Sequence, residues 1–167
     1  MFGEMRNAIA HVDRMIEIGR DDIAGSGIDA VYEYWENRRD GAFAPPRRRF
    51  RLDDLPASVI PCMAMIDFVG TPVDYYYRFF GSKMVEVAGR ELTGKRYFAD
   101  AVEGYGFVNA QLFPLLVERK VPMIHRVNWI SDRGLRIVTT SVRLPLSEDG
   151  EAVSGAVTAN DYRSPVH

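Results

Sequence analysis

Cysteine and histidine are scarce: the 167-residue sequence has one cysteine, Cys62, and three histidines. A single cysteine excludes an internal disulfide and any zinc site built on several cysteines, and it fits a reducing compartment. No apolar run approaches the roughly 18 residues of a membrane-spanning helix. Polar residues between Glu4 and Arg14 interrupt the apolar stretch that a signal peptide needs. We therefore expect a cytoplasmic protein with no membrane insertion.

An excess of charge of one sign is also missing. Lysine and arginine number 21 against 23 acidic residues, for a net charge of −2. No global field attracts nucleic acid or an anionic membrane. The sequence contains no Gly-x-Ser-x-Gly, His-Glu-x-x-His, phosphate-binding loop or dinucleotide-binding glycine pattern. These absences predict that the protein is not an enzyme and has no catalytic residues.

The residues that are present suit a folded domain, with 47% apolar and 26% charged. The length fits one domain with extensions. The predicted division is an N-terminal amphipathic helix in 1–24, a second helix and a Pro/Arg-rich linker in 25–61, a core in 62–162 and a tail in 163–167.

The N-terminal stripe of apolar residues has helical spacing. Met5, Ile9, Val12 and Ile16 fall on one face of a helix over residues 1–18. Such a face must pack on the domain or on another chain. We expect these four residues to contact a second copy in a homodimer, or a signalling protein.

The linker predicted at 41–61 is rich in proline, which discourages regular structure. It is also basic: arginines occupy positions 47, 48, 49 and 51, close after Arg38 and Arg39. The arginines either contact nucleic acid or another anion, or pair with Asp40, Asp53 and Asp54. Pairing is favoured, because the chain is slightly acidic and no recognition helix or stacking motif accompanies the patch. Nucleic-acid binding through Arg38–Arg51 stays an alternative.

Strand patterns flank a helical middle. The predicted elements are strands at 62–69 and 74–80, short helical pieces between 82 and 100, a helix at 102–119, and strands at 122–130, 135–146 and 152–160. Strands at both ends with helices between them predict an α+β fold. We expect a five-stranded antiparallel sheet with helices on one face, and amphipathic helices added at the N-terminus.

Three short motifs carry a family resemblance. They are Tyr77-Arg78-Phe79-Phe80-Gly81, Gly89-Arg90-Glu91-Leu92-Thr93-Gly94 and Leu144-Pro145-Leu146-Ser147-Glu148-Asp149-Gly150. With the element order, they resemble a PAS domain of a short bacterial single-domain subfamily, over about residues 28–162. The resemblance implies a sensory or regulatory domain that binds a small molecule or a protein and signals through protein contact.

The resemblance also bears on cofactors. Haem-binding relatives place the proximal histidine on the long helix, but 102–119 has none and His125 follows it. Flavin-binding photochemical relatives carry a cysteine in an Asn-Cys-Arg-Phe-Leu motif, which is absent here. Both departures count against haem and flavin. No cofactor and no metal are therefore predicted, and any ligand is an unidentified small organic molecule.

Strand alternation selects the side chains of a ligand pocket. Tyr75, Tyr77 and Phe79 share one face of their strand in this pattern. The pocket candidates are Tyr77, Phe79, Met84, Phe98, Val108, Leu112, Leu116, His125, Val127, Trp129, Val138, Thr140 and Val142. Core filling is the simpler interpretation of this set. A pocket would add polar groups, here Tyr77, His125 and Thr140.

Arg78 stands among aromatic residues in mid-strand, where a charge is seldom buried without a partner. We predict a structural ion pair with Asp67, in preference to anion binding by Arg78. An alternative function is a small cone-shaped α+β enzyme of the ketosteroid-isomerase type, with Asp67 and Tyr77 in an apolar pocket. Against it, the strand hairpin here precedes the helices.

Overall fold

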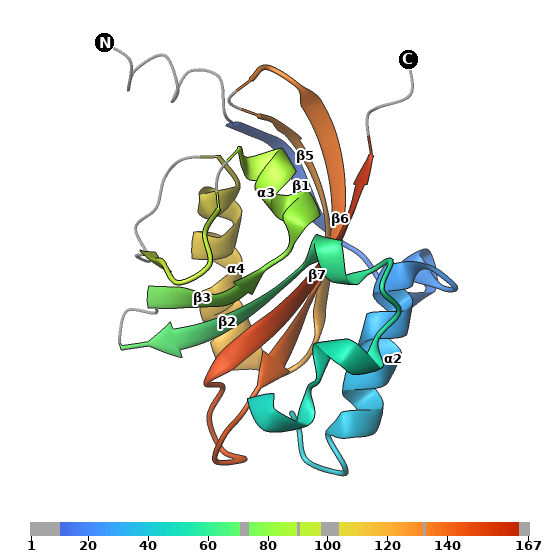
Figure 1. Cartoon of the computed structure of the whole chain (residues 1–167), viewed down its shortest axis with the longest axis vertical. Coiled ribbons are helices and arrows are strands. Elements are labelled where there is room, and N and C mark those ends of the chain that lie inside the picture. Colours follow the sequence, from blue (N-terminus) through green and yellow to red (C-terminus); the bar gives the residue numbers. More distant parts are fainter. Residues whose placement is uncertain (1–10, 71–73, 90, 98–103, 132, 164–167) are drawn as a thin grey trace.

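An antiparallel sheet with helices on both faces forms the framework in the computed structural model, which describes residues 11–70, 74–89, 91–97, 104–131 and 133–163 (Figure 1). The strands are β1 His11–Glu17, β2 Met63–Val69, β3 Asp74–Phe80, β4 Arg96–Tyr97, β5 Met123–Ile130, β6 Arg136–Leu146 and β7 Gly155–Arg163. They lie in the order β1-β5-β6-β7-β2-β3-β4, and every pairing is antiparallel. The fold is α+β, but the prediction of five strands is wrong. Six strands have seven residues or more, and β4 adds a two-residue edge.

Strand β1 replaces the predicted N-terminal helix over His11–Glu17. It pairs with β5, and Val12 and Met15 pack on the apolar cluster beneath α4 (Gly104–Arg119). An isolated amphipathic helix of this length gains little stability, whereas the edge of β5 satisfies the backbone hydrogen bonds of the segment. Val12 therefore contacts this domain's own interior, and Ile16 is half-buried. Met5 and Ile9 lie outside the described residues.

Helices cover both faces of the sheet: the helices predicted within the core share one face, as expected, and the added N-terminal helix covers the other. Helix α2 (Gly27–Arg38) lies on one face, and α3 (Ser82–Ala88) and α4 lie on the other (Figure 1). Ser26 begins α2, because its Oγ accepts the N–H of Asp29 at 3.3 Å. Helix α3 begins after Gly81 and ends at Ala88; Gly89 follows it with a φ of 75°, which suits a residue without a Cβ. None of the described helices is long and apolar enough to cross a membrane.

Residues 41–61 pack on the sheet and are not a loose linker. They form three short 3-10 turns, Arg47–Arg49, Leu52–Asp54 and Ile60–Cys62, and bury Phe50 and Leu55. These side chains join the α2 face of the core. Proline prevents a regular element here without preventing burial of apolar neighbours. The domain boundary predicted at residue 61 therefore crosses a shared core.

Two other differences concern turns. The last strand begins at Gly155, three residues later than predicted, because Asp149 Oδ1 accepts the N–H groups of Glu151 and Ala152 at 2.8 and 2.9 Å and holds the turn. Residues 91–97 form a turn and β4 where a further helical piece was predicted.

Candidate functional site

A β-bulge in β3 decides which aromatic side chains face α4. On β2, Ile66 pairs with Tyr77 and Met65 pairs with Phe79, so Arg78 is the extra residue. Tyr77 belongs to the cluster under α4, whereas Phe79 packs against the cluster under α2. The prediction that Phe79 shares the face of Tyr77 is wrong, because strict alternation fails at a bulge.

Strand β6 turns toward α4 the set of side chains that was predicted to face away from it. Val142 packs in the α2 cluster, and by alternation Val138 and Thr140 share its face. These three pocket candidates therefore lie opposite α4. The prediction assumed that apolar strand faces point toward α4, but α2 supplies a second apolar cover. The polar face of β6, with Thr139, is the one beneath α4.

Four buried polar side chains join β3, α4 and β6, and we call them the polar cluster: Tyr77, Asn109, Ser141 and Arg143. Arg143 is 1% exposed. Its Nη2 donates to Asn109 Oδ1 at 2.8 Å, and its Nη1 donates to Ser141 Oγ at 2.9 Å. Asn109 Nδ2 donates in turn to the hydroxyl of Tyr77 at 3.3 Å. Burying a guanidinium is costly unless it is hydrogen-bonded, so the cluster holds α4 to the sheet at one place.

His125, on β5 of the same face, is 4% exposed. Its Nδ1 has no hydrogen-bond partner within the described part of the chain. Burial, and after it the positive charge of Arg143, lower the pKa of His125 to about 4. Glu17 opposes this shift, and Arg119 reinforces it. The imidazole is therefore neutral at neutral pH, with an unused polar atom in the interior.

Apolar side chains surround the polar cluster. Trp129 Nε1 donates to Thr139 Oγ1 at 2.8 Å. The pocket candidates that the structure brings to this face are Tyr77, Met84, Val108, Leu112, Leu116, His125, Val127 and Trp129. Phe98 lies outside the described residues. Sequence reasoning missed Asn109, Ser141 and Arg143. The available signal was Arg143, a charge between two apolar residues of a strand.

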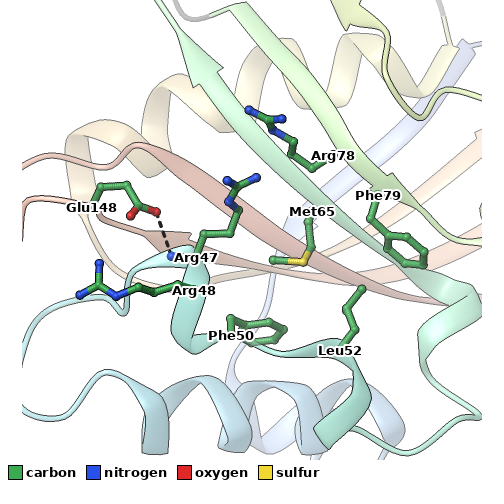
Figure 2. Close-up of a pocket in the computed structure, with 8 residues that line it drawn as sticks. All are labelled: Arg47, Arg48, Phe50, Leu52, Met65, Arg78, Phe79 and Glu148. Carbon is green, nitrogen blue, oxygen red and sulfur yellow. Dashed lines mark hydrogen bonds between the residues drawn. The ribbon is translucent and has the colours of Figure 1, made fainter.

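An open groove lies on the opposite face, with a cavity volume of about 420 Å³ (Figure 2). It is lined by Arg47, Arg48, Phe50, Leu52, Met65, Arg78, Phe79 and Glu148. Arg78 forms the predicted ion pair with Asp67, and Arg47 Nη1 lies 3.7 Å from Asp67 Oδ2. Asp67 and Tyr77, the pair suggested for an isomerase, therefore lie on opposite faces of the sheet.

The other arginines of residues 38–51 mostly pair with nearby acids. Arg38 pairs with Asp54 at 3.0 Å, Arg49 with Asp40 at 3.5 Å and Arg51 with Asp53 at 3.1 Å. These are the three acids named from the sequence, and each pair is at least partly exposed. The pairing leaves little free positive charge for nucleic acid on this segment.

Cys62 is half-buried, and burial raises the pKa of its thiol. Within the described residues, no group of three His, Cys, Asp or Glu side chains is placed to hold a metal ion. Comparison of the chain with protein-family models, curated proteins and solved structures found no match. The buried polar cluster and the open groove are thus the features that can indicate what the protein does.

Proposed function

We propose that the chain is a cytoplasmic sensory or regulatory domain of the PAS type, without catalytic activity. It binds a small organic molecule between the sheet and α4, and it signals through a second copy or a signalling protein. The element order supports this proposal: a strand hairpin, a short helix, the two-residue strand β4, a longer helix and three strands follow one another from β2 to β7.

The observation that carries the proposal is the polar cluster with His125 beside it. Ligand sites are largely apolar, with a few polar groups that fix the orientation of the ligand. An unsatisfied buried polar atom costs free energy, about 1–3 kcal/mol. A ligand that hydrogen-bonds to His125 Nδ1 removes that cost. Such a ligand also lies next to the contact between Arg143 and Asn109 that ties α4 to the sheet.

This arrangement suggests how binding is transmitted. A ligand that takes the hydrogen bonds of Asn109 shifts α4 relative to β6. Strand β1 contacts α4 through Val12 and Met15, and it ends the sheet on one side. Terminal strands present backbone groups that pair with other chains, so β1 is the surface we propose for a second copy.

Native mass spectrometry of the purified protein tests both the bound ligand and the dimer, because the native mass can be compared with the mass of the denatured chain. We expect a dimer that carries a bound small molecule. Asn109→Leu should remove the bound mass, because it breaks the polar cluster. Gln111→Leu, at an exposed position of the same helix, is the matched control and should keep it. The proposal of a bound ligand is wrong if the wild-type protein carries no bound mass and no compound in a library of polar metabolites raises its melting temperature. A monomer by light scattering at high protein concentration contradicts the dimer.

A further inference from the structure

The groove on the α2 face is amphipathic. Figure 2 shows Met65 between an apolar side, formed by Phe50, Leu52 and Phe79, and a basic side that carries arginine side chains. The two sides come from segments far apart in the chain. Residues 47–52 supply part of each, β2 and β3 supply Met65, Arg78 and Phe79, and the β6–β7 turn supplies Glu148.

The walls of the groove are held in place before any ligand arrives. Phe50 is buried and packs edge-to-face on Tyr34 of α2, with ring centroids 4.9 Å apart. The hydroxyl of Tyr34 accepts the N–H of Arg51 at 3.1 Å and donates to Asp54 at 2.7 Å. The bulge in β3 places Arg78 at the rim and turns Phe79 into the groove. A preformed wall reduces the ordering cost of binding.

The positive charges of the groove are not all neutralised. Arg47 and Arg78 share one carboxylate, Asp67. Glu148 accepts the backbone N–H of Arg47 at 2.9 Å (Figure 2). Arg48 has no ion pair with any residue that the structure describes. Three guanidinium groups therefore face two carboxylates, and the surplus charge lies beside an apolar wall.

We propose that this groove is a second ligand site, which binds a small carboxylate with an apolar tail. The tail packs on Met65, Leu52 and Phe79, and the carboxylate is held by Arg47 and Arg78 (Figure 2), whose guanidinium groups both lie beside Asp67. Guanidinium groups bind carboxylates through charge-assisted hydrogen bonds. A volume of about 420 Å³ lies in the range of small-molecule sites. The site is on the opposite face from the polar cluster and does not depend on the function proposed for that cluster.

Methyl-labelled methionine NMR can test the site directly, because methionines report on both faces. Met65 lines the groove, and Met84 packs on the α4 face. Decanoate, below its aggregation concentration, is the probe, with decanol and decyltrimethylammonium as neutral and cationic counterparts. Decanoate should shift the Met65 signal and leave Met84 unchanged. Decanol and decyltrimethylammonium should bind more weakly than decanoate. Added salt should weaken the binding of decanoate and leave the binding of decanol unchanged.

Variants separate charge recognition from general hydrophobic binding. Arg47→Gln should weaken the binding of decanoate about fivefold, the loss expected for one partly exposed charge-assisted contact. Arg49→Gln is the matched control: it lies in the same turn, pairs with Asp40 and does not line the groove. Asn109→Leu should leave the Met65 shift intact, so failure of one site is distinguishable from failure of the other. Equal weakening by both arginine variants, or a decanoate shift at Met84 without one at Met65, overturns the proposal.

Discussion

His125 makes the stability of the protein depend on pH in a defined window. The pKa of the buried imidazole is about 4, against an ordinary value of 6.5 for an exposed histidine. In that interval the unfolded chain binds a proton at this position and the folded chain does not. Stability is therefore complete above the unfolded pKa and falls as the pH decreases toward the folded one. The direction follows from the cause, because burial and the charge of Arg143 both penalise the imidazolium.

The size of the effect follows from the same two values. A difference of one pKa unit corresponds to about 1.4 kcal/mol, so the full window is worth at most roughly 3–4 kcal/mol. Between about pH 7 and about pH 5 the expected loss is about 2 kcal/mol. A carboxylate such as Asp29, whose pKa is lowered from 3.8 by its hydrogen bond to Arg20, loses its stabilising contribution only below this pH range.

Urea unfolding at a series of pH values measures this loss. His125→Phe and His125→Gln both remove the titrating group, and each should flatten the pH dependence whatever its effect at neutral pH. The second variant covers the case in which the larger ring does not fit. Met123→Leu, which changes a buried apolar side chain of the same strand and removes no titrating group, is the control and should keep the wild-type slope. If the His125 variants keep that slope as well, the imidazole is not the group responsible and the reasoning is wrong.

Two further predictions concern packing, and both are measured by urea unfolding at neutral pH. Gly155→Ala should lower the free energy of unfolding by more than about 2 kcal/mol, because a Cβ there would overlap the backbone carbonyl of Ile66 in the neighbouring strand. Gly19→Ala is the control: its Cβ would make only ordinary contacts, and the loss should be less than about 1 kcal/mol. Equal costs would show that the strands separate easily at this point. Trp35→Phe should cost about 1–3 kcal/mol, because the indole N–H donates to the buried carbonyl of Pro145 at 2.7 Å. A change of only a few tenths would mean that water replaces the bond.

Several elements were predictable because their signals are local. The glycines at 81 and 89 delimit α3, and the runs that begin at Met63 and Asp74 form β2 and β3. Turn residues, apolar runs and capping side chains act within a few positions, so the sequence around them is sufficient. The ion pair of Asp67 with Arg78 was predictable for the same reason, since the two strands form one hairpin.

The candidate sites were less predictable, because each depends on which face a strand presents. Alternation groups the side chains of a strand but does not say which group meets which helix. Phe79 changed face at a bulge, and Val142 faced α2 where α4 was expected. The polar cluster joins Asn109 to Arg143, which are 34 positions apart, through a contact that neither neighbourhood indicates.

The sequence by itself determined the α+β class, the strands and helices of the core, and the pairing of the linker arginines with nearby acids. All of these depend on periodicity or on short separations along the chain. Only the tertiary structure decided that residues 11–17 add a strand to the sheet, that α2 covers a second face, and that the polar cluster and the groove lie on opposite faces. These outcomes depend on which exposed edge or apolar face remains to be covered once the sheet has formed, and that is a property of the assembled fold.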